Sequence, residues 1–250
     1  MSININKLRQ LVNNKIEIEY FETIDSTQTY LLNNKTNNYK VVLGSYQTAG
    51  YGTRNRVYYS SKDLGVYFSI NMPANNTKYN ITLSSAAIVC DVLQRYSNKD
   101  IKIKWYNDIY SNNKKAVGIL AQTITDSNNK IENYVLGIGI NLYNPNNDVT
   151  FKLKNQVGYL FDNKTLALEE ILSIIINRIY FDYQSNISNI ELYNQNLLFK
   201  NKNILIKTSI NPKKVKVLKV EEDGRLVVKE NNKIIKYFRE QVELLAIEGE

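Results

Sequence analysis

The hydrophobic and polar positions of the chain divide it into two parts with different periods. Up to about residue 199, short runs with an apolar residue at every second position alternate with longer runs in which apolar residues recur every third or fourth position. These are the spacings of strands and of helices. After residue 199 only short alternating runs remain. We therefore predict an α+β domain over residues 1–199 and a small domain of strands over residues 200–250.

Five segments of the first part carry the helical period. In "NITLSSAAIVCDVLQRY", the apolar residues Leu83, Ala86 and Cys90 fall on one face of a helix. In the segment that begins near Thr165, glutamates stand in the first turn, where the helix dipole favours negative charge. The predicted helices cover residues 5–14, a short stretch after a polar turn at 25–27, and residues 80–96, 165–183 and 189–199.

The strand period appears in both parts. In "IKIKW", which begins at Ile101, isoleucine and lysine alternate, so one face of this strand is buried and the other presents Lys102 and Lys104. The asparagines of "SNNKK" tolerate the positive φ of a tight hairpin turn. Five short strands within the last 50 residues indicate a barrel-like module. The predicted strands cover 16–20, 39–47, 64–72, 100–110, 116–125 and 133–144, then 203–208, 213–223, 224–230, 233–238 and 242–247.

Composition narrows the chemistry. The 250 residues include no histidine and one cysteine, Cys90, which lies in an apolar run and is expected to be a buried, inert thiol. Disulfides, Ser-His-Asp catalysis and His-ligated zinc are therefore excluded. The net charge of +8 favours an anionic ligand such as a nucleotide, or an acidic partner, although a general bias toward Asn, Lys and Ile also explains it. With no membrane-length apolar run and no secretory segment, we expect a cytoplasmic protein.

The first candidate site is "SYQTAGYGTRNRVYYS", residues 45–60. Gly50 and Gly52 can bring backbone N–H groups close to a ligand, and Arg54 and Arg56 can neutralise its charge. Such spacing also occurs in ordinary surface turns. The loop alone is compatible with an anion site and with a polar turn between two strands.

The second candidate is "KIKWYNDIYSNNKKAVGIL". Lys104 ends a strand, Asn107 and Asp108 stand at its edge, and Lys115 leaves the hairpin shortly before Gly118. Two lysines supply point charges for phosphate or carboxylate oxygens, and an amide beside a carboxylate can hold magnesium or its waters. A solvated lysine face is the simpler reading of any one of these lysines.

The third candidate is "GIGIN", Gly137 to Asn141. Glycines in a buried strand can mark the close approach of a ligand or of another backbone. They can also mark a bulge packed beneath a helix. Asn141 at the end of the strand can contact polar atoms there. These residues alone leave both readings open.

Taken together, "DSTQTYL", "QTAGYGTRNR", "KWYNDIY" with "KKAVGIL", and "GIGIN" resemble the ordered motifs of biotin protein ligases. The resemblance covers residues 16 to about 200, and the small β module is similar to the SH3-like C-terminal domain of that family. It implies a mixed β-sheet with flanking helices, related to class II synthetases. It also implies a two-step reaction in which biotin and Mg-ATP form biotinyl-5′-AMP and pyrophosphate, and a lysine of a biotin carboxyl-carrier domain then takes the biotin and releases AMP.

The resemblance also implies residue roles. Lys115 would be the catalytic residue, contacting the biotin carboxylate and the α-phosphate, and Asp108 would face the magnesium ion. Trp105 would be a structural wall. The residues implied for biotin are Ser26, Thr27, Gln28, Gln47, Gly50, Gly52, Lys115 and Gly118, and those for ATP and the adenylate are Arg54, Arg56, Lys104, Asn107 and Asn141.

The chain departs from the motif at the loop. Tyr51 and Thr53 stand where the family has arginines, and Asn55 replaces a glycine. One arginine–phosphate contact is worth roughly 1.5–3 kcal/mol, so its loss weakens retention of an acyl-adenylate without abolishing its formation. We expect Arg54 or Arg56 to compensate; a ligase that leaks its adenylate is the alternative.

Three other functions are alternatives to a biotin protein ligase. A lipoate or octanoate ligase would usually carry an Arg-Arg-x-Ser-Gly-Gly-Gly loop and a following histidine, which are missing. A nucleic-acid-binding protein is disfavoured because the basic residues are dispersed and no DNA-binding domain precedes residue 16, so we expect no sequence-specific DNA binding. A remnant that only binds biotin stays open, and so does the choice between monomer and homodimer.

Overall fold

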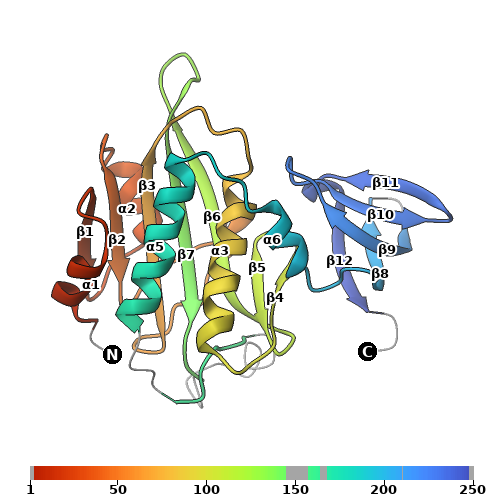
Figure 1. Cartoon of the computed structure of the whole chain (residues 1–250), viewed down its shortest axis with the longest axis horizontal. Helices are drawn as coiled ribbons and strands as arrows, with labels where there is room; N and C mark the ends of the chain where they lie inside the picture. The colour runs from red at the N-terminus through yellow and green to blue at the C-terminus, as the bar shows by residue number, and fades with distance from the viewer. Residues whose placement is uncertain (1–2, 145–156, 164–167, 210, 248–250) are drawn as a thin grey trace.

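The computed structural model describes residues 3–144, 157–163, 168–209 and 211–247, and it contains two β-sheets (Figure 1). The larger sheet has seven strands in the order β1-β2-β3-β7-β6-β5-β4. β1 and β2 are parallel and all other neighbours are antiparallel, so the sheet is mixed. The smaller sheet has five antiparallel strands in the order β11-β10-β9-β8-β12. The predicted α+β fold is confirmed.

The helices and strands follow one another in the predicted order. The helices are α1 (Ile5–Leu11), α2 (Thr27–Asn33), α3 (Ile81–Tyr96), α5 (Leu168–Gln184) and α6 (Ile190–Gln195), with short 3-10 turns η1 (Thr53–Asn55) and η2 (Arg239–Gln241). The strands are β1 (Ile16–Phe21), β2 (Tyr39–Gly44), β3 (Gly65–Pro73), β4 (Ile101–Lys104), β5 (Asp108–Ser111), β6 (Lys114–Thr125), β7 (Ile131–Asn141), β8 (Asn203–Thr208), β9 (Pro212–Val220), β10 (Leu226–Glu230), β11 (Lys233–Tyr237) and β12 (Val242–Ile247).

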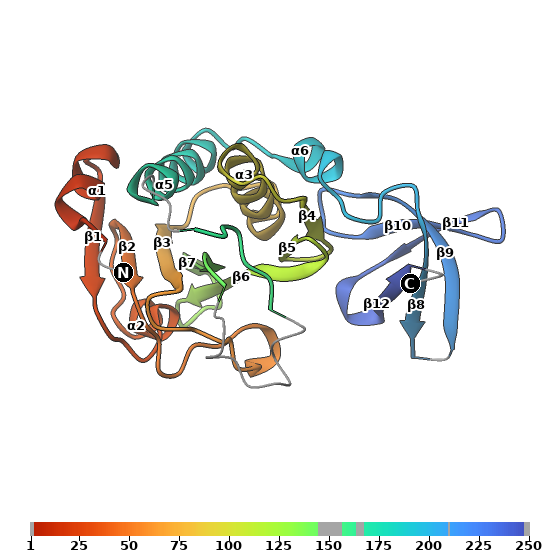
Figure 2. The same ribbon diagram turned by 90° about the horizontal axis from the view of Figure 1, so that it is seen from below.

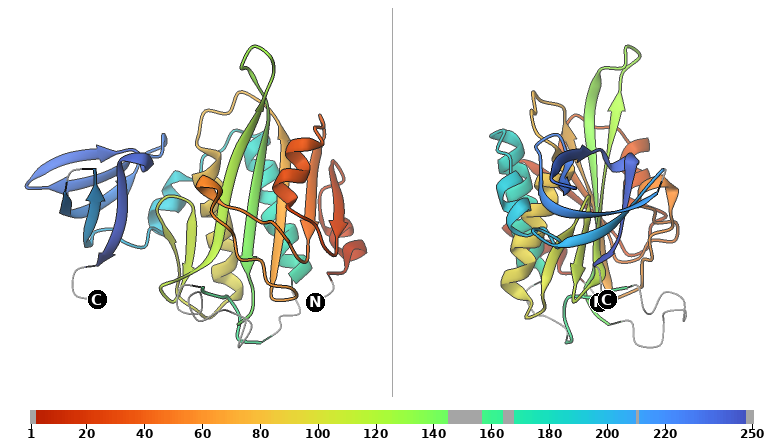
Figure 3. Two further views of the ribbon diagram at one scale, coloured as in Figure 1. Left: turned by 180° about the vertical axis from the view of Figure 1, so that it is seen from behind. Right: turned by 90° about the vertical axis from the view of Figure 1, so that its right-hand side faces the viewer.

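Long helices cover one face of the large sheet and leave the other face to α2 and the segment that follows β2. In Figure 2 α1, α5, α3 and α6 lie on the same side, and Figure 3 shows α2 and the orange segment crossing the opposite face. The apolar stripe of α3 is fully buried against the sheet, and Cys90 lies within it. Cys90 is buried, as expected from the sequence, and burial raises the pKa of its thiol to about 12.

One predicted strand is wrong in its length. Residues 100–110 form two antiparallel strands, β4 and β5, joined by a tight turn at Trp105, Tyr106 and Asn107. Buried and half-buried positions alternate without interruption from Ile101 to Tyr110, so the period alone could not show the break. The following hairpin turn is as predicted, because Asn112 and Asn113 have φ values of 47° and 64°.

The small sheet contacts the large one through the turn between β4 and β5. Trp105 Nε1 donates a hydrogen bond of 3.0 Å to the carbonyl of Gly224 in the β9–β10 turn. Asn194 of α6 bonds both backbone groups of Val220 in β9. These contacts support the boundary that we propose at residues 199 and 200. None of the helices in the described ranges is long and apolar enough to span a bilayer.

Candidate active site

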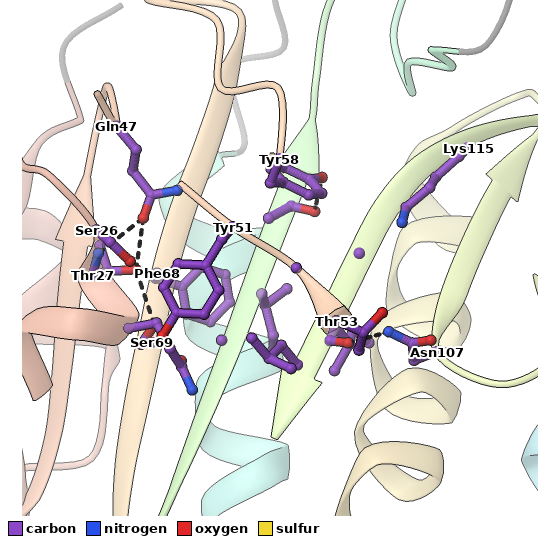
Figure 4. Close-up of a pocket in the computed structure, with 18 residues that line it drawn as sticks. Ser26, Thr27, Gln47, Tyr51, Thr53, Tyr58, Phe68, Ser69, Asn107 and Lys115 are labelled. Atoms are coloured by element: carbon purple, nitrogen blue, oxygen red, sulfur yellow. Dashed lines mark hydrogen bonds between the residues drawn. The ribbon is translucent and has the colours of Figure 1, made fainter. Parts of the chain in front are cut away.

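A narrow pocket of about 50 Å³ lies on the sheet face opposite α3 and α5 (Figure 4). A hydroxyl- and amide-rich corner forms one end, and Asn107 and Lys115 stand at the other. The residues that line the pocket are Ser26, Thr27, Gln28, Gln47, Tyr51, Gly52, Thr53, Tyr58, Phe68, Ser69, Asn107, Lys115, Gly118, Ile119, Leu120, Gly137, Ile138 and Gly139.

The corner is built around the start of α2. Ser26 is the N-cap, and its Oγ accepts a hydrogen bond from the backbone N–H of Thr29. Thr27 donates to Gln47 Oε1 from its backbone N–H at 2.9 Å and from Oγ1 at 3.1 Å. Thr27 Oγ1 also lies 2.9 Å from Ser69 Oγ on β3. Because Gln47 Oε1 is held in this way, its amide group has a fixed orientation toward the pocket.

Gln28 forms the floor of this corner and is 4% exposed. Its Nε2 donates to the carbonyl of Val135 at 3.0 Å and to Gln122 Oε1 at 3.1 Å, while Ser69 Oγ donates to its Oε1. Both the Nε2 and the Oε1 of this amide are therefore engaged by residues of the sheet. Gln28 stands where the motif has asparagine.

The glycines of β6 and β7 let two side chains lie directly on the sheet. A Cβ on Gly137 would come within 2.6 Å of Gln28 Oε1, and one on Gly139 within 2.6 Å of the Tyr58 ring. Gly118 is the register partner of Gly139, and a Cβ on it would lie 2.7 Å from the same ring. At "GIGIN" the sheet is therefore approached closely by side chains of α2 and of the loop, and the pairing of β6 with β7 is regular there.

Lys115 and Asp108 form an ion pair of 2.7 Å at the far end of the pocket. A register shift after Ile109 places both Lys115 and Gly118 on the face that carries Asp108. Three residues apart, Lys115 and Gly118 would otherwise point to opposite faces of a strand. Such a bulge re-aims a side chain, and here it turns the ammonium group of Lys115 into the pocket.

The other residues of the "KWYND" segment differ in their exposure to the pocket. Asn107 is 6% exposed, lines the pocket and donates its side-chain N–H to the carbonyl of Ile119. Lys104 is the register partner of Asp108 and does not line the pocket. Burial lowers the pKa of Lys104, while the neighbouring carboxylates of Asp108 and Glu243 oppose this shift. Asn141, at the end of β7, also lies outside the lining.

The loop after β2 closes the pocket with aromatic and hydroxyl groups in place of guanidinium groups. Tyr51 and Thr53 line the pocket, and Tyr51 OH donates to Gln122 Oε1 at 3.1 Å. Arg54 and Arg56 are exposed and do not line it. A Cβ on Gly50 would lie 2.7 Å from Gln47 Nε2, so this glycine lets the loop pack onto the corner.

The sequence did not identify three groups of the pocket. Ser69 lies in the strand "VYFSINM", and a serine in a strand that is otherwise apolar was an available signal. Tyr58 follows the arginines by two residues, and its OH donates to the carbonyl of Gly139 at 2.7 Å. Tyr51 was noted only as the loss of an arginine. In the tertiary structure it contributes a ring and a hydroxyl group.

The described architecture is the α+β fold of solved biotin protein ligases. The enzyme from Aquifex aeolicus in complex with biotin and ATP superposes with a TM-score of 0.74 at 18% identity, covering 92% of this chain and 98% of that one. The enzyme from Leishmania major in complex with biotinyl-5-AMP gives a TM-score of 0.56 at 18% identity, covering 89% and 98%. The likeness establishes the fold.

Sequence comparison shows which proteins the chain is similar to. Residues 20–141 match the Biotin/lipoate A/B protein ligase family. The bifunctional ligase/repressor BirA of Bacillus subtilis is 28% identical over 244 residues, which are 90% of this chain and 73% of that protein. BirA of Bacillus spizizenii is 32% identical over 143 residues, 54% of this chain and 43% of that protein. Over residues 20–141, just under half of its length, the chain is similar to the biotin/lipoate A/B protein ligase family.

Proposed function

We propose that the chain is an ATP-dependent biotin protein ligase, which activates biotin as biotinyl-5′-AMP and transfers it to a lysine of a biotin carboxyl-carrier domain. The observation that carries this is the arrangement of the pocket. A neutral corner of hydroxyl and amide groups stands at one end and an ammonium group at the other. This polarity matches a ligand with a urea-like head and a carboxylate tail.

The first step joins biotin to the nucleotide. A biotin carboxylate oxygen attacks the α-phosphorus of ATP, the bond from that phosphorus to the bridging oxygen breaks, and pyrophosphate leaves. Lys115, which lines the pocket, would contact both the attacking carboxylate and the α-phosphate oxygens. Its charge would reduce their mutual repulsion and stabilise the negative charge that develops. Because positioning and charge stabilisation suffice, the reaction needs no histidine.

The second step transfers the acyl group. The neutral amine of the acceptor lysine attacks the carbonyl carbon of the mixed anhydride, an amide bond forms, and AMP leaves with the electron pair of the broken bond. We assign the acceptor to a carrier domain because the relatives are ligases of the same fold.

The corner at α2 would hold the biotin head. Thr27, Gln47 and Ser69 offer hydroxyl and amide groups for the urea-like N–H and carbonyl, and Ser26 and Gln28 keep this frame in place through their own hydrogen bonds. Gln47 Nε2 lies 3.2 Å from Ser60 Oγ, a contact that a ligand carbonyl can replace. Gly50, Gly52 and Gly118 would allow close approach of the loop and the ligand.

Magnesium would arrive with the nucleotide. The described residues contain no group of three or more Asp, Glu, Cys or His that could hold a metal ion. Mg²⁺ keeps several waters and is usually bound by substrate phosphates with one or two carboxylates, so the single carboxylate of Asp108 fits this role. Lys104, Asn107 and Asn141 would stand on the nucleotide side.

A ligation assay tests the proposal. The protein is incubated with biotin, Mg-ATP and a biotin carboxyl-carrier domain, with an unrelated protein and a carrier whose acceptor lysine is replaced as controls. Labelling restricted to the intact carrier is expected. Equal labelling of the unrelated protein would identify a ligase that releases its adenylate, and no pyrophosphate release would refute the proposal. Lipoate or octanoate in place of biotin tests the alternative acids.

A further inference from the structure

A second cavity adjoins the pocket, and a cation of the C-terminal sheet lies in it. This recess of about 380 Å³ is lined by residues of both sheets, and it shares Thr53, Ile119 and Leu120 with the pocket. Ligand pockets typically measure roughly 300–1,000 Å³, which the pocket of about 50 Å³ does not reach without the recess. Within the described part of the chain, the recess gives a ligand of the pocket room to extend.

Arg239 is the arginine of the recess. It begins η2 between β11 and β12, and Nη2 donates to Thr53 Oγ1 at 3.0 Å. Its guanidinium group also stacks on the Tyr106 ring at 5.3 Å from the centroid. Phe238 and Gln241 bond each other across the turn, which fixes the position from which Arg239 extends. The guanidinium group is held by a hydroxyl and a ring, neither of which neutralises it.

The charge of Arg239 is free for an anion. Within the ranges that the structure describes, no carboxylate lies within salt-bridge distance of it. Asp223 also lines the recess, but it pairs with Arg225 at 2.7 Å, and this hydrogen bond lowers the pKa of its carboxyl group. Glu240, the other carboxylate of the lining, is exposed.

We propose that Arg239 binds the phosphate chain of the nucleotide, supplying from the C-terminal sheet the guanidinium group that the loop lacks at Thr53. This rests on the proposed function, which places a nucleotide beside Lys115. Arg54 and Arg56 are exposed and line neither cavity, so they do not provide this charge in the described conformation. Arginine suits the role because its planar donors match two phosphate oxygens at once.

The test measures pyrophosphate exchange and Mg-ATP binding for Arg239→Gln and Arg239→Lys. Loss of one charge-assisted contact is expected to raise the KM for Mg-ATP roughly 10- to 100-fold, with the KM for biotin within about threefold. Arg239→Lys is expected to regain part of this loss. Lys233→Gln removes one charge from the same sheet at an exposed site outside the recess, and it should leave both constants within about twofold.

Three results would overturn the assignment: an unchanged KM for Mg-ATP in Arg239→Gln, an equal rise in both KM values, or a loss carried by Arg54→Gln or Arg56→Gln instead. If Arg239 only attaches the small sheet, its replacement should raise the KM values for Mg-ATP and for biotin together. It should also lower the midpoint of thermal unfolding, which is measured for each variant. Titration with Mg-ATP alone separates this inference from the proposed function. If the wild-type protein binds Mg-ATP, loses this binding in Arg239→Gln and exchanges no pyrophosphate, the ligase reaction alone is refuted. If the wild-type protein does not bind Mg-ATP, both the ligase reaction and the role of Arg239 are refuted.

Discussion

At the scale of residues, one row across the large sheet carries the charged groups. Lys104, Asp108, Gly118 and Gly139 are register partners on four successive strands, and Lys115 joins their face through the bulge after Ile109. The ion pair with Asp108 orients the ammonium group of Lys115. A carboxylate and a phosphate would take the place of this single partner.

Lys115→Gln should lower the rate of pyrophosphate exchange about 10- to 100-fold, because an amide cannot replace a charge-assisted contact to two anionic groups. The matched control is Lys114→Gln, since Lys114 is the exposed neighbour and does not line the pocket. Equal effects of the two substitutions would remove Lys115 from the reaction.

Lys104→Met should stabilise the fold while it weakens Mg-ATP binding. Burial depresses the pKa of Lys104, so the charged form costs free energy of folding at neutral pH; this cost is fully present below the folded pKa and is relieved as pH rises above it. Replacement by an apolar side chain removes the cost at pH 7. Thermal unfolding at pH 7 and near pH 10 should show a gain that shrinks at the higher pH. A lower midpoint at pH 7 would contradict this.

At the scale of elements, the face of β6 and β7 is shaped by its glycines. The sheet surface is flat beneath Gln28 and Tyr58 because Gly118, Gly137 and Gly139 have no side chains. The Tyr58 ring thus rests on backbone, and burial raises the pKa of its hydroxyl, which stays a neutral donor to the Gly139 carbonyl. The pocket wall depends on this contact.

Gly139→Ala should displace the Tyr58 ring, cost about 1–3 kcal/mol of stability through overpacking, and raise the KM for biotin. The double variant with Tyr58→Ser removes the collision, so the two changes should be non-additive in a double-mutant cycle. Additive free energies from urea unfolding would show that the added methyl group does not act through Tyr58.

At the scale of the whole molecule, the C-terminal sheet is joined to the turn at Trp105, Tyr106 and Asn107, which leads into Asp108. Trp105 bonds the carbonyl of Gly224, and the Tyr106 ring lies against Gly224 from the other side. The predicted structural role of Trp105 fits this contact, since its indole is 7% exposed. The same turn positions Asn107 and Asp108, so the attachment of the small sheet and the geometry of the site are linked.

Gly224→Ala should therefore weaken both stability and Mg-ATP binding. Gly224 has φ of 91°, which disfavours any Cβ, and the new methyl group would lie 2.8 Å from the Tyr106 ring. Asn231→Gly is the control, because this residue of the next hairpin turn already has a positive φ of 46°. A normal KM for Mg-ATP in Gly224→Ala would show that the sheet is attached without influencing the site.

The sequence by itself determined the order and type of most elements and several of the residues that line the pocket. Hydrophobic periods depend on local spacing, and the four motifs name Ser26, Thr27, Gln47 and Lys115 directly. These features are visible because residue type and short spacing are enough to define them.

Only the tertiary structure decided which side chains face one another. Alternation puts Lys115 and Gly118 on opposite faces, and the bulge that reverses this depends on strand pairing, which local spacing does not encode. Arg54 and Arg56 were expected to supply the loop charge, yet they are exposed, whereas Arg239 reaches Thr53 from 186 residues away in sequence. A contact of that separation exists only once two sheets pack, so no pattern along the chain could have predicted it.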